Sequence, residues 1–299
     1  MRKVIKAAIS LLLLSMAFAS CDDSGGGGST GSPGSAADMF GNGIRLKSCG
    51  GNRYYYDEKG RIESIDIGSY DYVFSYSPNK IDVGDDTKSV SVSYNGNGYL
   101  SSMKISSKEE SLSSTENISF SYNGNGHLTK MSMTGNASGM EDGKKQTGTQ
   151  KITATFSWEG DLLAKVECKE EGKSGNNSFS STDIYAFTYD RDDREYNYNK
   201  YCQYTPDLLQ WYEGDFNMRA LFYVGLLGKG PLYLPSSCDY EYQRVWITNG
   251  KKEENSGGNS YSLSYGFNKD GTLSKVYSRY SSYSYDYMYV DTGSSGNLR

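Results

Sequence analysis

The stretch that decides the fold is written twice in this chain. VSVSYNGNGYLSSMKI occupies residues 90–105, and ISFSYNGNGHLTKMSM occupies residues 118–133. In residues 119–122 polar and aromatic side chains alternate with a period of two, which is the pattern of a strand with one buried face. The Asn-Gly-Asn-Gly that follows supplies residues that tolerate positive φ, as a tight turn between two twisted strands requires. Each copy therefore predicts a β-hairpin.

The skeleton of this hairpin recurs along the chain. It consists of an aromatic residue, three further residues, a glycine, one residue, and a leucine or isoleucine. The copies are Tyr56/Gly60/Ile62, Tyr94/Gly98/Leu100, Tyr122/Gly126/Leu128, Phe156/Gly160/Leu162 and Phe267/Gly271/Leu273. A degenerate copy begins at Tyr189, with Asp193 in the glycine position. Repeated units of this size stack to share one core. We therefore expect an all-β fold: a large curved antiparallel sheet or barrel of repeated β-hairpins, with roughly fourteen strands.

Hydrophilic stretches with few apolar residues separate several of the expected strands. They cover residues 106–117, 135–150, 169–177 and 249–259. Because they show little apolar alternation, we predict long, mobile loops there.

One segment departs from the strand pattern. Thr205 can cap a helix that has Pro206 at its first position. Asp215 can cap a second turn or helix, whose apolar residues are Phe216, Met218, Leu221, Phe222 and Val224. We predict a short helical insert near residues 205–228 that plugs the open end of the sheet or covers its edge. The alternative is a partner-binding surface.

The N-terminus has the pattern of a bacterial lipoprotein leader. Arg2, Lys3 and Lys6 precede a mostly apolar run, and small residues lead up to Cys21. The apolar run is too short to span a bilayer as a mature helix. We predict a signal peptide over residues 1–20, lipidation (palmitate) at Cys21 with a Gly/Ser-rich tether over residues 21–37, and a single β-hairpin-repeat domain over residues 38–299. The alternative is an ordinary secretory signal with an incidental cysteine.

The residues after Cys21 bear on the location. Asp22-Asp23 resembles the signal with which Bacteroidetes send lipoproteins to the cell surface. We therefore expect a protein anchored by lipid in the outer membrane, at the cell surface; the alternative is the periplasmic face.

Two features of the repeat and the leader together resemble known proteins. The aromatic-Asn/Asp turns at Tyr56-Asp57, Tyr94-Asn95, Tyr122-Asn123 and Phe267-Asn268 resemble the YD repeats of RHS-type wrapped β-sheets. With the leader and the stretch LLGKGPLYLPSS at residues 226–237, the chain from about residue 45 more closely resembles a family of Bacteroidetes lipoproteins of unknown function with a porin-like fold. The resemblance implies a curved antiparallel sheet or barrel, and it supplies no catalytic residues.

The net charge and the cysteine content bear on nucleic-acid binding and on disulfide formation. Removing the three basic leader residues takes the formal charge from −5 to −8 (−5 − 3), so the mature chain has no electrostatic basis for binding nucleic acid. Four cysteines remain beyond Cys21: Cys49, Cys168, Cys202 and Cys238. An oxidising compartment allows three disulfide pairings, and buried thiols are an equal alternative.

The search for catalytic residues yields none. His127 is the single histidine and fills the turn position that Tyr99 fills in the twin repeat, so we expect a turn residue there. Histidine-based nucleophilic catalysis and multi-histidine metal sites are then not available. Residues 57–60 and 268–271 faintly resemble calcium loops, but the downstream glutamate is missing and turn chemistry explains them. We therefore predict no catalytic residue, no metal and no cofactor.

Two classes of function remain. The first is a non-catalytic binding or structural module for a glycan or a partner protein, because Trp158, Trp211 and Trp246 offer flat amphipathic faces. Cross-strand packing is the alternative role of these rings. The second class is a carboxylate-dependent glycan hydrolase with candidates among Asp190, Asp192, Asp193 and Glu195, which a solvated turn explains as well. Any site is expected where the insert meets the sheet, around Trp211 and Tyr212.

Overall fold

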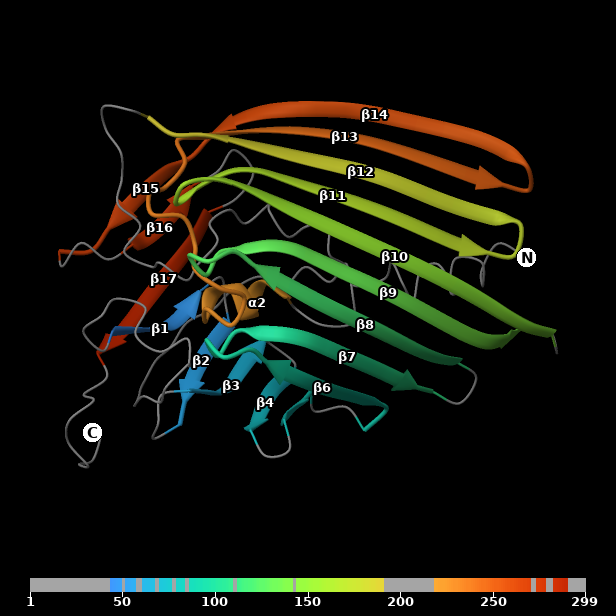
Figure 1. Ribbon diagram of the computed structural model, residues 1–299, viewed down its shortest axis with the longest axis horizontal. Coiled ribbons are helices and arrows are strands. Elements are labelled where there is room, and N and C mark those ends of the chain that lie inside the picture. Colours follow the sequence, from blue (N-terminus) through green and yellow to red (C-terminus); the bar gives the residue numbers. More distant parts are fainter. Residues whose placement is uncertain are drawn as a thin grey trace.

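The computed structural model describes residues 44–49, 52–57, 61–67, 70–76, 79–83, 86–109, 112–141, 144–190, 218–269, 273–277 and 282–289. These residues form seventeen strands and one short helix (Figure 1). In chain order the elements are β1 (Ile44–Cys49), β2 (Asn52–Tyr56), β3 (Ile62–Ile67), β4 (Tyr70–Tyr76), β5 (Asn79–Asp82), β6 (Lys88–Tyr94), β7 (Leu100–Lys108), β8 (Leu112–Tyr122), β9 (Leu128–Glu141), β10 (Lys144–Glu159), β11 (Leu162–Ser174), β12 (Asn177–Thr188), α2 (Met218–Tyr223), β13 (Ser237–Thr248), β14 (Lys251–Ser262), β15 (Ser264–Phe267), β16 (Leu273–Tyr277) and β17 (Ser282–Tyr289). The predicted all-β fold is confirmed, with more strands than expected.

The strands form an antiparallel meander that turns back on itself. From β1 to β14 each strand pairs with the next along the chain, β15 pairs with β16 and β16 with β17, and β1 pairs with both β2 and β17. β14 and β15 are successive parts of one strand bent at Leu263, whose N–H donates to the carbonyl of Ser236 at 2.8 Å. β14 pairs with β13, whereas β15 pairs with β16. Within the described residues the sheet is therefore strongly curved but not closed along its whole length.

Figure 1 shows that the strands differ greatly in length. The long strands from β7 to β14 form a curved wall that extends well beyond the short strands β1–β5 and β15–β17. We call the side of the sheet that carries the buried hydrophobic residues the inner face. The helix α2 lies in the hollow on this side, near the end where the short strands gather (Figure 1).

The prediction of long mobile loops is wrong. β9 and β10 pair without a break from Lys144↔Glu141 to Thr155↔Lys130, and β11 pairs with β12 up to Ser174↔Asn177. Residues 249–259 likewise form a turn and most of β14. Hydrogen bonds to the neighbouring strands satisfy the backbone N–H and C=O groups of these polar segments. Strand pairing therefore needs no apolar alternation there.

The repeated turn has the geometry that its sequence predicts. In the β8–β9 hairpin the Oδ1 atom of Asn123 accepts the N–H groups of Asn125 and His127, each at 3.0 Å. Asn95 makes the same two bonds in the β6–β7 hairpin. Gly98 and Gly126 have φ of 78° and 87°. Such values carry a steric penalty for residues with a β-carbon, which explains the glycine in this position.

The register of the hairpins confirms four copies of the skeleton and corrects one. The aromatic residue lies opposite the leucine or isoleucine in the pairs Tyr56↔Ile62, Tyr94↔Leu100, Tyr122↔Leu128 and Phe267↔Leu273, each beside a register shift. In the remaining copy the residues that face each other beside the shift are Trp158 and Leu163, not Phe156 and Leu162. The turn at Gly160 is one residue shorter than in the other copies. The skeleton with its fixed spacing therefore selected the wrong aromatic residue and the wrong leucine.

A side-chain hydrogen bond links four of the hairpins to the one before them. The aromatic side chain at the strand end donates to the carbonyl of the leucine or isoleucine in the preceding hairpin. The bonds are Tyr76 Oη to Ile62 (2.9 Å), Tyr122 Oη to Leu100 (2.6 Å), Trp158 Nε1 to Leu128 (2.8 Å) and Tyr189 Oη to Leu163 (3.0 Å). The repeat of the sequence is therefore a repeat of tertiary contacts.

The helix α2 confirms a short helical insert, and its apolar side chains pack into the core of the sheet. Met218, Leu221, Phe222 and Val224 are at most 2% exposed, and the Phe222 ring lies 6.2 Å from that of Phe156. Burying such side chains stabilises the fold by about 1.5–3 kcal/mol each. The first part of the predicted insert, residues 205–217, lies outside the described residues.

After the helix, residues 224–236 run across the turn ends of successive hairpins, and we call this segment the strap. Its backbone hydrogen bonds join Leu226 to Leu100 (2.8 Å), Lys229 to Gly126 (2.9 Å), Leu232 to Asp161 (2.9 Å) and Ser236 to Thr188 (2.8 Å). The strap therefore fixes the ends of β7, β8–β9, β10–β11 and β12 relative to one another.

Three of the four cysteines lie in the described part of the chain. Cys49, Cys168 and Cys238 are buried thiols, and no disulfide joins them to each other. Burial raises the pKa of the Cys168 thiol well above its ordinary value. For these three the alternative of buried thiols holds; Cys202 lies outside the described residues. The described residues also include no helix long and apolar enough to cross a membrane.

Candidate functional site

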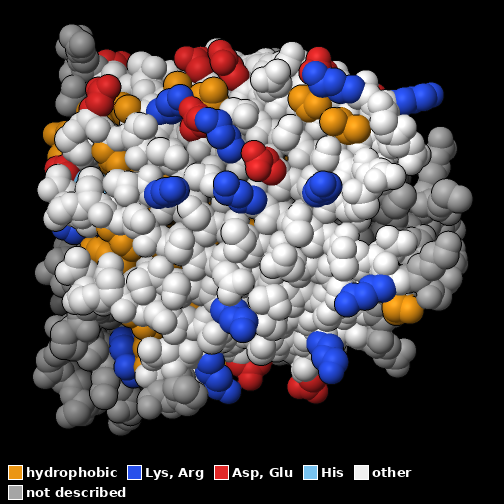
Figure 2. Space-filling model, turned by 45° about the vertical axis from the view of Figure 1, so that its right-hand side comes forward, with side chains coloured by type: hydrophobic (Ala, Val, Ile, Leu, Met, Phe, Trp, Pro, Cys, Tyr) orange, Lys and Arg blue, Asp and Glu red, His pale blue; other side chains and the backbone are white. Residues whose placement is uncertain are grey.

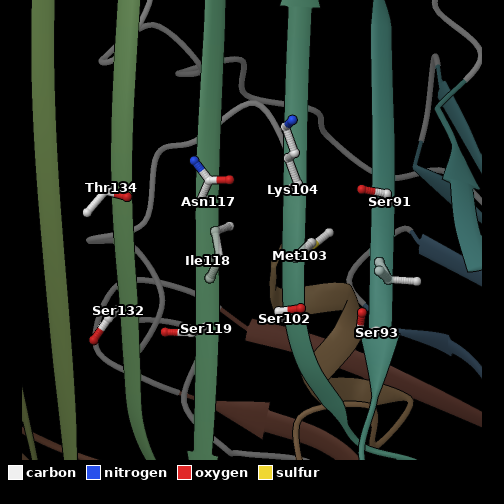
Figure 3. Close-up of a pocket in the computed structure, with 11 residues that line it drawn as sticks. Ser91, Ser93, Ser102, Met103, Lys104, Asn117, Ile118, Ser119, Ser132 and Thr134 are labelled. Atoms are coloured by element: carbon white, nitrogen blue, oxygen red, sulfur yellow. The ribbon is translucent and has the colours of Figure 1, made fainter.

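The outer face of the wall is polar. The face turned to the viewer in Figure 2 shows mostly uncharged polar side chains and backbone, with separate lysine and arginine side chains and few hydrophobic ones. A shallow depression of about 440 Å³ crosses β6–β9 on this side of the sheet; its polar lining residues are Ser91, Ser93, Ser102, Lys104, Asn117, Ser119, Ser132 and Thr134 (Figure 3). These side chains alternate with the buried Val92, Met103 and Ile118. The lining of this depression includes no aromatic ring that could orient a ligand.

The inner face of β13 carries a row of large side chains. Tyr240, Tyr242, Arg244 and Trp246 follow the buried Cys238 at every second position, and no register shift interrupts the pairing of β13 with β12 or β14. Alternate residues of a strand share a face. These four side chains therefore form one line along β13, which we call the β13 ladder. All four are partly exposed, unlike the apolar core residues below them.

The ladder is stacked from Tyr240 to Arg244. Tyr240 lies between Tyr185 of β12 and Tyr242, with ring centroids 4.8 and 5.8 Å away and interplanar angles of 23° and 28°. The guanidinium carbon of Arg244 lies 4.9 Å from the centre of the Tyr242 ring. Offset stacking and cation–π contact each add about 0.5–1.5 kcal/mol beyond area burial. The stack therefore holds the rings in fixed orientations.

A buried carboxylate anchors the ladder from β12. Oδ1 of Asp183 accepts the hydroxyl of Tyr240 at 2.6 Å and lies 3.5 Å from Nη2 of Arg244. Asp183 is 5% exposed, whereas the Arg244 side chain is 42% exposed. Burial and the hydrogen bond to Asp183 raise the pKa of Tyr240, so the phenol stays protonated and donates. The arginine thus keeps donors directed toward solvent while its charge is balanced.

The strand β14 flanks the ladder with short side chains. Gly257 lies opposite Tyr242, and a β-carbon there would come within 2.9 Å of the tyrosine ring. Asn255 and Asn259 lie opposite Arg244 and Tyr240 and are exposed. On the other flank β12 contributes Ser181 and Asp183 opposite the same part of β13. Exposed amide groups of β14 thus border the rings on one side, and the buried Ser181 and Asp183 of β12 lie on the other.

At the far end of the ladder a second ring pair continues the surface. Trp246 lies opposite Phe179 of β12, with ring centroids 5.6 Å apart at 40°. Trp246 thus has the cross-strand packing role that was the alternative to ligand binding. Both rings nevertheless remain partly exposed.

The single histidine is a structural link rather than only a turn residue. His127 is 3% exposed; its Nε2 lies 2.9 Å from Oδ1 of Asp161 and its Nδ1 lies 3.0 Å from the carbonyl of Lys229. Its ring stacks on Trp158 at 4.1 Å. Of the two roles considered for Trp158, ligand binding and packing, the structure therefore shows packing. The sequence missed this burial because the histidine follows a polar turn.

Several residues singled out in the sequence lie outside the described part of the chain. They are Cys21, Asp192, Asp193, Glu195, Trp211 and Tyr212. Asp190 is exposed. Asp57 accepts the N–H of Arg61 at 2.8 Å and binds its guanidinium, which agrees with turn chemistry. No group of three or more His, Cys, Asp or Glu side chains that could hold a metal ion occurs among the described residues.

Sequence reasoning missed the ladder, although a signal was present. Residues 240–246 read YEYQRVW, in which aromatic and basic residues alternate with smaller or polar ones. This strand pattern places the larger side chains on one face.

Comparisons with known proteins show a similarity in structure. No family model matches the chain, and no curated protein matches it. Among solved structures, the chain is similar to a porin-like protein from Bacteroides uniformis ATCC 8492, with a TM-score of 0.46 and 14% identity over 79% of this chain and 90% of that one. Membership of the lipoprotein family, and the YD-repeat assignment with it, stays a prediction.

Proposed function

We propose that this chain is a lipid-anchored protein of the cell envelope whose β domain binds glycan without catalysis. The observation that supports it is the β13 ladder, in which partly exposed rings lie beside the guanidinium of Arg244 and the exposed amides of Asn255 and Asn259. Sugar rings have apolar faces and polar edges, so they are suited to an aromatic surface flanked by such hydrogen-bonding groups. Cys21 would supply the anchor, and the tether would hold the domain away from the lipid headgroups.

The geometry favours binding over the alternative of a carboxylate-dependent hydrolase. Such an enzyme needs one carboxyl group free to donate a proton and a second one on the other side of the scissile bond. Asp183, the carboxylate beside the ladder, is buried and engaged by Tyr240 and Arg244. It is placed to orient the rings and is poorly placed to transfer a proton.

A glycan array with the full-length chain in detergent tests the proposal. We expect binding to at least one glycan, loss of that binding in Trp246→Ala, and no change in Gln243→Ala. Gln243 lies on the same strand but on the opposite face and is exposed, so it is a matched control. Product release from a bound glycan, measured by mass spectrometry, would turn the proposal toward the hydrolase. Binding that Trp246→Ala leaves intact, or an array without any bound glycan, would contradict the ladder as the site.

A further inference from the structure

The shape of the ladder carries information about its ligand. Tyr240, Tyr242, Arg244 and Trp246 lie on one strand, and the pairing of β12, β13 and β14 runs without a register shift beside them. At about 3.3–3.4 Å per residue, the line from Tyr240 to Trp246 is roughly 20 Å long. A compact monosaccharide would use only a part of this length.

We infer that the ligand is a linear, uncharged glycan that lies along β13 with its chain parallel to the strand. This inference rests on the proposed function and specifies its ligand. The rings repeat along one direction, and the exposed amides of Asn255 and Asn259 on β14 follow the same direction on the accessible side. A chain of sugar rings presents a matching arrangement, with apolar faces in a row and hydroxyl groups along the edge that would face β14.

The charges of the ladder favour a neutral chain. Arg244 is its one cation, and the carboxylate of Asp183 lies 3.5 Å from the guanidinium. A carboxylated sugar placed over Arg244 would have to share this cation with Asp183, which is buried and cannot move into solvent. An uncharged hydroxyl can instead accept from the exposed N–H groups without disturbing the pair.

The strand β14 leaves the ladder accessible from its side. Residues 251–260 are all exposed, and Gly257 and Gly258 carry no side chain that would project over β13. Tyr242 instead lies across Gly257. A long chain can therefore enter from the edge of the wall without first being threaded through an opening.

The test measures affinity against chain length with the full-length protein in detergent. The probes are uncharged α-1,4- and β-1,4-linked glucose oligomers of two to six rings, and galacturonic acid oligomers of the same lengths. We expect the affinity for one uncharged series to rise about three- to tenfold with each added ring up to about four rings and then to level off, because each aromatic contact contributes modestly. The charged series should bind at least about tenfold more weakly.

Variants locate the chain on the ladder. Trp246→Ala should lower the affinity for four rings more than for two, so that the length dependence levels off earlier, and Trp246→Phe should retain most of it. Gln243→Ala on the outer face should leave the whole series unchanged. An affinity independent of length, no binding of any uncharged oligomer, or tighter binding of the charged series would overturn the inference. A positive glycan array alongside any of these results would leave the proposed function standing.

Discussion

The imidazole of His127 lies nearly flat on the indole of Trp158, with ring centroids 4.1 Å apart and 18° between the planes. Each ring also binds a neighbouring segment. Nε1 of Trp158 donates to the carbonyl of Leu128, while the histidine contacts Asp161 and the carbonyl of Lys229. This stack therefore joins the β8–β9 hairpin, the β10–β11 hairpin and the strap.

Replacing His127 should weaken this junction. We expect His127→Ala to lower the free energy of unfolding by about 2–3 kcal/mol, because it removes a buried ring and two hydrogen bonds. His127→Phe keeps the stack and loses the bonds, so about 1–2 kcal/mol is expected. Denaturant unfolding measures both. An alanine variant as stable as the parent would show that the strap holds without the histidine.

Tyrosines 94 and 122 occupy the same repeat position but differ in hydrogen bonding. Tyr122 donates to the carbonyl of Leu100 at 2.6 Å, whereas the buried hydroxyl of Tyr94 has no hydrogen-bond partner in the described structure. Burial raises the pKa of Tyr94 to about 12. Tyr122→Phe should cost about 1 kcal/mol, and Tyr94→Phe should be neutral or stabilising. Thermal unfolding of the pair checks the inter-hairpin bond, and equal losses would contradict it.

The hairpins could be predicted because their causes are local. An asparagine side chain that accepts two backbone N–H groups, and a glycine at positive φ, lie within a few residues of each other. The long strands could not be predicted in this way. Residues 251–260 are all exposed and lack apolar alternation, so only pairing with β13 makes them a strand.

The turn glycine offers a direct test of the repeat. Gly126 has φ of 87°, and an added β-carbon would lie 3.1 Å from the hydroxyl of Tyr99. Gly126→Val should cost about 1–3 kcal/mol because a β-branched residue is disfavoured at this φ. Gly124 in the same turn has open space around it, so Gly124→Ala is the control and should be nearly neutral. Similar melting temperatures for the two variants would exclude the tight-turn geometry.

Stability should fall in acid partly through Glu167. Hydrogen bonds from Lys165 and Lys169 lower the pKa of this carboxyl to about 2. A lowered folded-state pKa gives stability that is present above the unfolded value of 4.5 and is lost as the pH falls toward 2. Since both lysines are exposed, the contribution is about 1 kcal/mol. Glu167→Gln should flatten the pH dependence of unfolding between 4.5 and 2; an unchanged slope would contradict it.

The candidate site was harder to predict from the sequence than the fold. The large side chains at every second position from Tyr240 to Trp246 can be recognised in the sequence. The residues that they contact on β12, however, are distant in the sequence. Asp183 is 57 residues from Tyr240, and their contact follows only from the pairing of β12 with β13. The expectation placed around Trp211 and Tyr212 lies outside the described residues and stays a prediction.

The lipid anchor is tested by removing its attachment atom. Cys21→Ala has no thiol to acylate, so we expect the protein to move from the membrane pellet to the soluble envelope fraction. Cys202→Ala leaves the leader unchanged and should remain in the pellet, which controls for general effects of losing a cysteine. Immunoblots of fractionated cells after a salt wash provide the measurement, and protease treatment of intact cells then separates the cell surface from the periplasmic face. Retention of Cys21→Ala in the washed pellet would mean that another part of the chain holds the membrane.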